Sequence, residues 1–502
     1  MKKFIALFIT CILLMQSFPV GAAIPYMSQG FVPYNSFGFW RLEGDGGRFG
    51  RFFMQAPYKP AQPMPVIGNP LFVDGESVQG LHTPVDLFIC ENDTIFVVDQ
   101  NQNRAVQMTA QSELLQQFGD EEGPGRLHNP QGIFVRNDTG EVYISDTGNF
   151  RVAIFNPEGE FIREITQPND ARIADLLFRP QRIGIDSRGF YVLQLLGENR
   201  GLMILSPNGE FNGFFGANIT RMGVLDMIQT RFFTIEQRLA TQRVQNSVSD
   251  MYIDTLGFIY TTTPAENTEQ IRKFNIGAQN LWRGRQMDVA PIETLAMGWQ
   301  EGMRTAFQSV TVDERGNVFA LCAGTGRIFM FDSFGEPVFN FGAQMRDRGN
   351  LTVGLFGNPQ AIRVDSQGRL FVADIIYRGV LVFEPTPFAA QIKALNYLQQ
   401  GGRWQDAVPL AQEVLRENVF FTQAHMIMGM AAFQEQDWNA ARAYFRRAFN
   451  TSEYSEAFWE NRLILIHNYF AYVMLIIPLL GLFFAVKSII KRKKRNAASS
   501  AA

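Results

Sequence analysis

A four-residue signature, Asp-x-x-Gly, recurs through the middle of this chain and restricts what the chain can fold into. It stands at residues 186–189, 254–257, 313–316 and 365–368, each time after an apolar residue and a few positions before Phe or Tyr. Asp accepts hydrogen bonds from backbone N–H groups further along the turn, and Gly tolerates the positive φ that closes it. The signature therefore predicts tight hairpins between short antiparallel strands.

The hairpins belong to a longer repeating unit, which is clearest in residues 127–165. There, four short segments of β-forming residues are separated by turn clusters at residues 137–140, 146–149 and 156–159. Six copies of this unit follow one another at a spacing of roughly 45–70 residues, and four-stranded units of about this period form β-propellers. We therefore predict a mainly β fold, with a six-bladed β-propeller over residues 83–386.

Motifs in the second copy resemble the NHL repeat. Asn-Pro-Gln-Gly-Ile at residues 129–133 is followed by Val-Tyr-Ile-Ser-Asp at residues 142–146, and Asn149 and Arg151 come shortly after. The resemblance implies an NHL-type propeller, a scaffold that hosts both enzymes and binding platforms.

The resemblance extends over roughly residues 83–384 but is uneven. The sixth copy repeats both motifs, at residues 358–362 and 370–374, whereas the fourth copy reads Tyr-Thr-Thr-Thr at residues 260–263. The motifs therefore specify the fold well and leave the function open.

The N-terminal region carries a targeting signal and an extended arm. Lys2 and Lys3 precede an apolar run and then small residues, so residues 1–23 are interpreted as a signal peptide, with an uncleaved anchor as the alternative. Residues 24–82 are rich in Pro and form the arm. The sixth copy offers only three strands, so we expect a strand from the arm, residues 71–78, to complete that sheet and remove its open edge.

Two further features of the propeller region carry predictions. The insertion at residues 217–246 has apolar residues at helical spacing, which indicates either a covering helix or a partner-binding lid. Cys90 and Cys322 fall in different copies, so we expect no disulfide between them and treat both as small hydrophobic residues.

Residues 387–462 change to a helical pattern with an internal repeat. Trp404 and Ala407 match Trp438 and Ala441, each thirty-four residues later. The pattern resembles the tetratricopeptide repeat, which has that period, and implies a pair of helical hairpins that bind protein. We expect the two tryptophans to lie in the core, and Phe420 and Phe421, at a connection between helices, to be contact candidates.

The last part of the chain resembles a membrane anchor. Residues 463–490 contain an eighteen-residue stretch, 469–486, without charge, followed by Lys487 and five consecutive cations at residues 491–495. This length suffices for a transmembrane helix, and the cations place residues 491–502 in the cytoplasm and the rest of the mature chain outside. A buried core helix is the alternative, although such a helix needs no charged stop.

The charge of the chain is distributed unevenly. The net charge is −3, and removing the eight cations of the two end segments leaves −11 on residues 24–486. An acidic ectodomain argues against a nucleic-acid partner. The expected partners are a protein or cell-envelope ligand and a neighbouring membrane protein.

The propeller region offers few groups for catalysis. Of four histidines, only His82 and His128 are near it, too few for a zinc site. Asp99, Asp146 and Asp374 recur at equivalent strand ends and could form a calcium or lactone site facing the channel. Alternatively, each ties its local turn, as Asn149 and Arg151 beside Asp146 suggest. The substitutions at the matching places, Gln194, Thr263 and Cys322, favour this structural role.

These observations assign no catalytic, cofactor-binding or metal-binding residue, and the ligand-binding residues stay unknown. We expect a membrane-anchored, extracytoplasmic binding or scaffold protein that needs no cofactor. The alternative is a membrane-tethered propeller enzyme similar to a lactonase or lyase.

Overall fold

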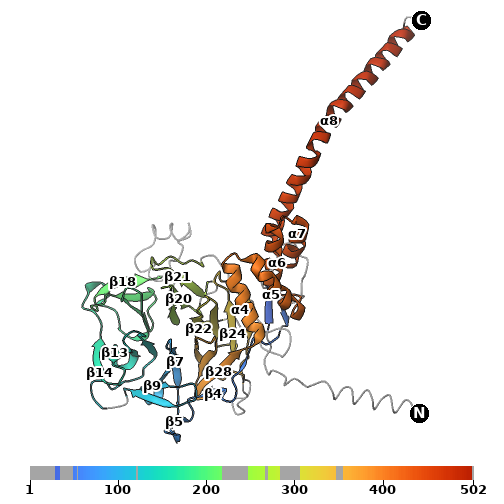
Figure 1. Cartoon of the computed structure of the whole chain (residues 1–502). Helices are drawn as coiled ribbons and strands as arrows, with labels where there is room; N and C mark the ends of the chain where they lie inside the picture. The colour runs from blue at the N-terminus through green and yellow to red at the C-terminus, as the bar shows by residue number, and fades with distance from the viewer. Residues whose placement is uncertain are drawn as a thin grey trace, which may run out of the picture. The chain divides into compact units, whose positions relative to one another are not determined.

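The structure is a computed structural model of the chain, divided into two compact units (Figure 1). One unit consists chiefly of residues 41–400 and the other chiefly of residues 401–502. The predicted signal peptide and the insertion at residues 217–246 lie outside the described residues. The structure describes residues 29–33, 49–53, 55–119, 122–216, 247–265, 269–282, 306–345 and 354–499.

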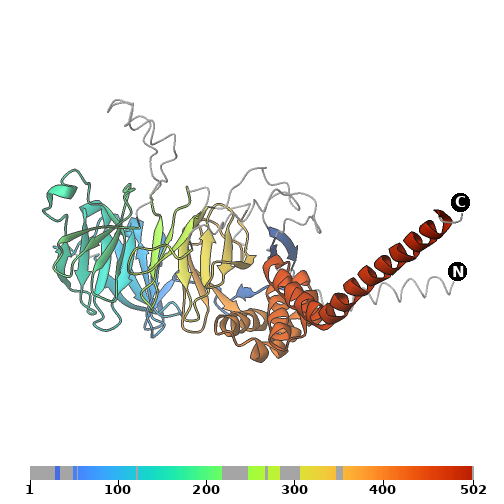
Figure 2. The same cartoon turned by 90° about the horizontal axis from the view of Figure 1, so that it is seen from above.

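Six antiparallel sheets form a ring, which confirms the six-bladed propeller (Figures 1 and 2). The first strands of successive sheets contact one another in order, and the first strand of the sixth sheet contacts that of the first sheet. The strands of the six blades are β7 (Pro84–Ile89), β8 (Ile95–Asp99), β9 (Arg104–Met108) and β10 (Leu114–Phe118); β11 (Gly132–Val135), β12 (Val142–Asp146), β13 (Arg151–Phe155) and β14 (Phe161–Ile165); β15 (Pro180–Ile185), β16 (Tyr191–Leu195), β17 (Leu202–Leu205) and β18 (Phe211–Phe215); β19 (Asp250–Ile253), β20 (Ile259–Thr262) and β21 (Ile271–Phe274); β22 (Phe307–Val312), β23 (Val318–Cys322), β24 (Arg327–Phe331) and β25 (Pro337–Phe341); and β26 (Pro359–Val364), β27 (Leu370–Asp374) and β28 (Gly379–Pro385).

The hairpin chemistry expected from the sequence is present. In the β26–β27 hairpin, Asp365 Oδ1 accepts hydrogen bonds from the backbone N–H groups of Gln367 and Arg369, at 3.0 and 2.7 Å. Gly368 has a φ of +76°, a conformation that L side chains rarely adopt. Short 3₁₀ helices follow the second strand in two blades and precede β15 in the third: η1 (Gln100–Gln102), η2 (Thr147–Asn149) and η3 (Ala171–Ile173).

The core lies between successive sheets. Phe118 of the first sheet meets Phe155 of the second edge-on, with ring centroids 5.9 Å apart, and Ile133 and Ile144 pack in the same cluster. Cys322 is buried in the fifth sheet, and both Cys90 and Cys322 are free thiols, as expected.

A strand from the N-terminal arm completes the sixth sheet, but it is not the expected segment. β3 (Tyr58–Pro60) and β4 (Val66–Ile67) both pair with β28. Residues 71–78 instead form a separate hairpin of β5 (Leu71–Val73) and β6 (Glu76–Val78). The reason is the turn between them, where Asp74 and Gly75 both have positive φ and close a two-residue loop.

Two further segments add to the propeller unit. β1 (Gln29–Pro33) pairs with the outer strand β25, and β2 (Phe49–Phe53) follows it in the same sheet. Helix α4 (Pro387–Gln400) packs on the fifth and sixth blades, where Lys393 Nζ lies 3.4 Å from Asp313 Oδ2 and Asn396 donates to Asn317. The predicted helical region of residues 387–462 is therefore divided, because its first helix belongs with the propeller.

The second unit is a succession of packed helices. Ala407 and Ala441 are fully buried, as expected for positions where helices approach closely. Asp437 caps the helix Trp438–Arg447 by accepting a hydrogen bond from the Ala440 N–H at 3.0 Å. The helices lie where the tetratricopeptide resemblance placed them, and membership of that family stays a prediction. They are α5 (Trp404–Glu417), α6 (Thr422–Gln434), α7 (Trp438–Arg447) and α8 (Thr451–Ser499).

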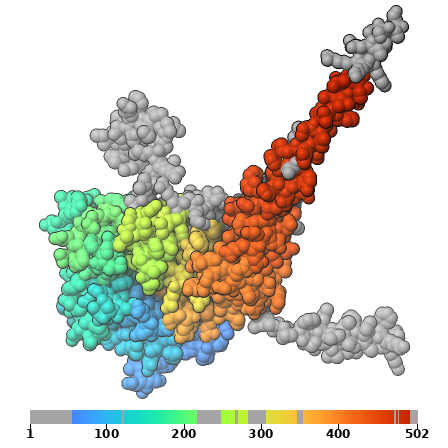
Figure 3. All heavy atoms as spheres, turned by 45° about the horizontal axis from the view of Figure 1, so that its top comes forward, coloured from blue at the N-terminus to red at the C-terminus, as the bar shows by residue number. Residues whose placement is uncertain are grey.

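Helix α8 is long and apolar enough to cross a membrane. It extends from the other helices of its unit as a single rod (Figure 3). Its segment Thr451–Lys491 contains a window of eighteen residues with a mean hydropathy of 2.5, none of it buried. An unburied apolar helix is unlike the core helix of a soluble domain, and the membrane anchor stays a prediction for this segment.

Candidate functional site

The centre of the propeller is built from one position in the first strand of each blade. Strand register places Asp86, Arg182, Asp250 and Ser309 at the same position as Gly132 of the second blade. The sixth blade has Ala361 there, and Arg363 follows two residues later on the same strand. Because alternate residues of a strand share a face, Arg363 can join the group from its own blade.

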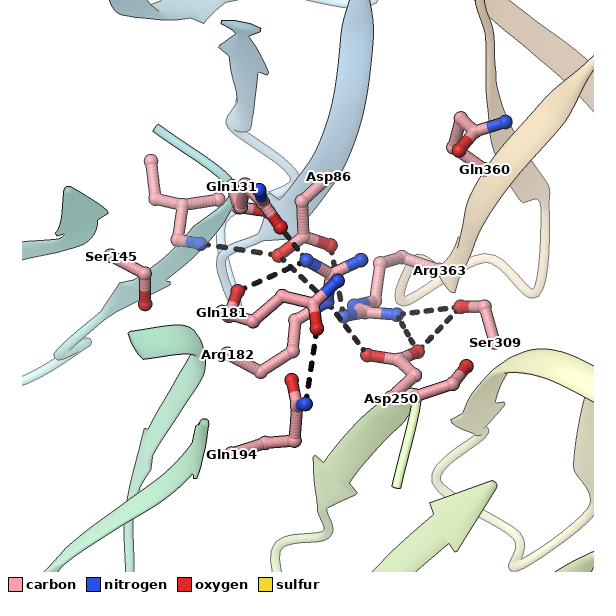
Figure 4. Close-up of polar contacts among 12 residues, drawn as sticks. Asp86, Gln131, Ser145, Gln181, Arg182, Gln194, Asp250, Ser309, Gln360 and Arg363 are labelled. Atoms are coloured by element: carbon pink, nitrogen blue, oxygen red, sulfur yellow. Dashed lines mark hydrogen bonds and ion pairs between the residues drawn. The ribbon is translucent and has the colours of Figure 1, made fainter. Parts of the chain in front are cut away.

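Four of these residues form a closed ionic ring (Figure 4). Arg182 Nε lies 3.7 Å from Asp86 and 3.1 Å from Asp250, while Arg363 lies 3.2 Å from Asp86 and 3.3 Å from Asp250. All four residues are at least 93% buried. With two carboxylates and two guanidinium groups, the ring carries no net charge, which lowers the cost of burying it.

Hydrogen bonds occupy the oxygens of the ring carboxylates. Asp250 Oδ2 accepts from the Ser309 hydroxyl at 2.6 Å and from the Val310 N–H at 3.1 Å. Asp86 Oδ2 accepts from the Ile133 N–H at 3.1 Å. Arg182 Nη1 donates to the backbone carbonyls of Gln131 and Gln181. The ring and its hydrogen-bond partners are therefore a satisfied network that joins the first strands of all six blades.

The two ring carboxylates differ in acidity. Burial raises the pKa of Asp86, and the neighbouring Arg182 and Arg363 offset this only in part. Burial acts on Asp250 too, but Arg363, Arg182 and the Ser309 hydroxyl together hold its pKa below the usual value. The difference follows from geometry, since Asp250 has the additional hydroxyl donor and Asp86 does not.

A polar pocket of about 340 Å³ opens beside the ring. Five glutamines are among the residues that line it. Gln100 follows the second strand of the first blade, and each of the other four directly precedes the ring position of its blade: Gln131, Gln181, Gln308 and Gln360. Ser249 has the matching place in the fourth blade, and Arg182 also contributes to the lining. The pocket is thus the mouth of the central channel, with neutral amides around its wall.

The glutamines differ in how far they are already bonded. Gln308 Nε2 lies 3.4 Å from Gln360 Oε1, and Gln360 Nε2 donates to Asn358 Oδ1 at 3.0 Å. Gln181 Oε1 accepts from Gln194 Nε2 at 3.0 Å. The side chain of Gln131 makes no hydrogen bond with the part of the chain that the structure describes. In Figure 4, Gln131 and Gln181 lie beside Arg182, and Gln360 lies apart from them.

The recurrent aspartates of the sequence analysis have a structural role and do not line the pocket. Asp99 accepts from the backbone N–H groups of His82 and Thr83, at 3.0 and 2.8 Å. Asp146 accepts from the His128 N–H at 2.7 Å, and Asp374 from the Gly357 N–H at 2.7 Å. Each carboxylate therefore ties the segment that enters its blade. Burial raises the pKa of both Asp99 and Asp374, and the hydrogen bonds from these N–H groups reduce that rise.

Neighbours of Asp146 confirm the local interpretation. Asn149 Nδ2 and Arg151 Nε both donate to Asp146 Oδ2 at 2.8 Å. At the matching places, the register confirms Thr263 and Cys322 but not Gln194. Arg182 pairs with Gln194 as Gly132 pairs with Ser145, so Leu195 stands where the first, second and sixth blades have Asp. The prediction for Gln194 was one residue out: this place lies nine residues after the Asp of the Asp-x-x-Gly turn in the fourth, fifth and sixth blades, and the same spacing from Asp186 gives Leu195.

The histidines near the propeller do not line the pocket. His82 and His128 are both exposed, in segments that precede the first strands of their blades. Among the residues described, no three His, Cys, Asp or Glu side chains are grouped so that they could hold a metal ion. The arrangement offers hydrogen bonding at the mouth and a closed ionic network behind it.

Sequence reasoning missed both the ring and the glutamines. Gln131 and Gln360 stand in the Asn-Pro-Gln motifs, and Gln181 and Gln308 occupy the same place in the third and fifth copies. An alignment of the six copies on this motif would have found the glutamines. It would also have placed Asp86, Arg182 and Asp250 in one column, but not Arg363.

The fold and the site define a six-bladed β-propeller with an ionic centre and an open polar mouth. The chain matches no family profile and no curated protein by sequence. It is similar in fold to virginiamycin B lyase from Staphylococcus aureus, at 11% identity over 63% of this chain and 87% of that chain, with a TM-score of 0.39.

Two other solved structures have comparable similarity. Hydrazine synthase from Kuenenia stuttgartiensis has 13% identity over 63% of this chain and 99% of that chain, with a TM-score of 0.38. A protein provisionally named a gluconolactonase has 12% identity over 64% of this chain and 93% of that chain, with a TM-score of 0.40. Similarity at this level concerns the architecture of the propeller and carries no information about activity.

Proposed function

We propose that the protein is a membrane-anchored, extracytoplasmic binding protein whose propeller holds a polypeptide ligand at the mouth of its channel. The main support for binding rather than catalysis is the ionic ring. An acid–base catalyst needs a titratable group with a free position within reach of the substrate. Every oxygen of Asp86 and Asp250 already faces a guanidinium, a hydroxyl or an N–H group.

The lining of the mouth supports a polypeptide ligand. A glutamine carboxamide both donates and accepts hydrogen bonds, as a backbone peptide group does. The apolar residues of the lining are small and aliphatic: Val85, Val248, Pro264 and Ile375. Among the described lining residues none is aromatic, whereas sugar rings commonly pack on aromatic faces. These features favour a peptide over a glycan.

The C-terminal helices support the anchoring part of the proposal. The apolar segment of α8 ends at Lys487, and the cations at residues 491–495 follow, so the propeller would lie outside the cytoplasm. The compact helical unit begins at residue 401, and we propose that it docks a neighbouring membrane protein. For that role Phe420, which is 65% exposed, stays a candidate. Phe421 does not, because only 2% of it is exposed and it belongs to the core.

Site-specific photocrosslinking in native membranes tests the ligand-binding function. A photoreactive residue at Ser249, in the pocket, should form covalent adducts with a polypeptide. The same residue at Arg188, on an exposed hairpin of the third blade, is the matched control and should not. Equal adducts at both positions, or none at Ser249, would contradict the proposal. Turnover of a lactone or peptide by the purified chain, lost on chelation of metal, would favour the enzyme alternative.

A matched pair of substitutions tests the docking role. Phe420→Ser should reduce crosslinks between the helical unit and other membrane proteins while the chain stays folded. Phe421→Ser should destabilise the helical unit by about 3–5 kcal/mol, as truncation of a buried Phe does. Unchanged crosslinking in Phe420→Ser, and in a chain lacking residues 401–450, would show that this unit does not dock a partner.

A further inference from the structure

Hydrogen-bond donors are distributed unevenly around the pocket at the channel mouth. In the fifth and sixth blades, Gln308 and Gln360 bond to each other, and Gln360 Nε2 also donates to Asn358. These two blades lie across the ring from the second and third. The side formed by Gln308 and Gln360 therefore has fewer donors left for a ligand.

The side formed by the second and third blades has three donor groups available. Gln131 makes no side-chain hydrogen bond within the described residues, and Gln181 uses only its Oε1, which accepts from Gln194. Arg182 uses Nε for Asp250 and Nη1 for the carbonyls of Gln131 and Gln181. No described residue accepts a hydrogen bond from Arg182 Nη2. The Nε2 groups of both glutamines and Nη2 of Arg182 thus remain for a ligand on one side of the pocket, and the amide of Gln100, from the first blade, lines the pocket beside them.

The charge at the mouth has one sign. Arg182 is the one charged side chain among the described residues that line the pocket. The carboxylates of Asp86 and Asp250 face the guanidinium groups and are not part of the lining. A ligand entering the pocket therefore meets a positive group flanked by two amides.

We infer that this side of the pocket binds a carboxylate, and that the carboxylate is the C-terminal end of a polypeptide. A carboxylate only accepts hydrogen bonds, at about four lone-pair positions, so it can use three donors at once. Its bond to a guanidinium is assisted by charge. The bonded pair of Gln308 and Gln360 would then contact the amides that precede the chain end, and capture of a terminal carboxylate is a known mode of peptide recognition.

This inference rests on the proposed peptide-binding function, and the test separates the two. The full-length protein in nanodiscs is incubated with a library of N-acetylated hexapeptides that have free C-termini, and in parallel with the same library amidated at the C-terminus. Empty nanodiscs are the blank. We expect peptides of the free-acid library to be retained and to bind at least tenfold more tightly than their amidated forms.

Variants locate the carboxylate. Gln181→Glu places a carboxylate beside Arg182 and should reduce binding at least tenfold, because it occupies the ligand's position. Gln360→Glu adds the same charge across the pocket and should have a smaller effect. Both avoid Arg182, whose replacement would disturb the ring, and thermal melts of both should match the unchanged protein.

The possible outcomes are distinct. Equal retention of acid and amide libraries would overturn the carboxylate inference and leave peptide binding intact. Equal losses in Gln181→Glu and Gln360→Glu would overturn the assigned position. Retention of neither library would overturn the inference together with the proposed function. If glucuronate displaces the retained peptides at lower concentration than N-acetylglycine does, the carboxylate belongs to a sugar and the peptide assignment is wrong.

Discussion

Arg363 donates a hydrogen bond from Nη2 to Asp86 Oδ1 at 3.2 Å, across 277 residues of sequence. The contact joins the first strand of the sixth blade to the first strand of the first blade. Arg363 also reaches Asp250 of the fourth blade and the Ser309 hydroxyl of the fifth. The propeller is therefore closed twice, at its centre by this side chain and at its rim by the pairing of β3 and β4 with β28.

The central closure can be tested with Arg363→Met. The substitution removes one of two cations from a buried ring, so Asp86 and Asp250 are left to share Arg182. Breaking a buried ion pair from one side costs about 3–5 kcal/mol, because a desolvated charge loses its partner. The apparent stability of the propeller should fall by that amount in thermal or urea unfolding of the full chain in detergent.

Arg188→Met is the matched control for the ring. Arg188 also pairs with a buried carboxylate, Asp186, at 2.7 Å, but 48% of its side chain is exposed and water can replace it. Arg188→Met should therefore lower the stability of the propeller much less than Arg363→Met does.

A double variant tests whether Asp86 and Arg363 act as a pair. In Asp86→Leu with Arg363→Met, the loss of stability should be less than the sum of the two single losses, since both substitutions remove the same interaction. Additive losses would show that the two residues do not act as a pair.

A second prediction concerns the Asp-x-x-Gly hairpins. Gly368→Val should destabilise the propeller by about 1–3 kcal/mol, because a β-branched residue is strained at positive φ. The added Cβ would also lie 2.9 Å from Lys393 Nζ, although that flexible end can move. Gly324→Val is the control, since Gly324 is an exposed turn residue without positive φ and without neighbours near the added Cβ. Equal melting temperatures for the two variants would refute the argument.

The blades could be predicted because their signals are local. An Asp, a Gly and a short β-forming run lie within a few residues of one another, and turn chemistry decides their conformation. The recurrent aspartates were interpreted correctly for the same reason, since Asn149 and Arg151 stand next to Asp146 in the sequence. Gln194 is the exception, since the nine-residue spacing that connects Asp254 with Thr263 gives Leu195 when it is counted from Asp186.

The ring and the closing strand could not be predicted in the same way. Asp86, Arg182, Asp250 and Arg363 are ordinary charges in four separate strands, and only the closed ring brings them together. The strand that completes the sixth sheet was misplaced because residues 71–78 look more like a strand than the Pro-flanked β3 does. A strand ending in Pro60 suits an outer edge, however, where a missing N–H group costs little.

A third prediction concerns the pH dependence of the helical unit. His425 of α6 is 8% exposed, and its Nε2 lies 2.8 Å from the Val419 carbonyl oxygen. Burial lowers the pKa of His425, Arg447 lowers it further, and the Val419 carbonyl opposes them. The folded unit therefore favours the neutral ring. As pH falls below about 6.5, the unfolded chain binds a proton more readily than the folded one, so stability is lost.

Hydrogen exchange of α6 measures this effect. After correction for intrinsic rates, protection of residues 422–434 should fall between pH 7 and pH 5, by at most about 1.4 kcal/mol per pH unit. His425→Gln, which keeps a donor for Val419, should remove the dependence. His128→Gln, at an exposed histidine of the propeller, should leave it unchanged. If the pH dependence of protection persists in His425→Gln, another titratable group causes it.

The last prediction is the topology of the anchor. The apolar segment of α8 is followed by cations at Lys487 and residues 491–495, and such clusters stay in the cytoplasm. Residues 24–468 should therefore lie outside the membrane and residues 487–502 inside. Protease added to intact spheroplasts should digest the propeller and spare an epitope tag placed after Ala502, whereas permeabilised spheroplasts should lose both. If the propeller is digested only after permeabilisation, the orientation is the reverse of the predicted one. The proposed extracytoplasmic ligand would then be wrong as well.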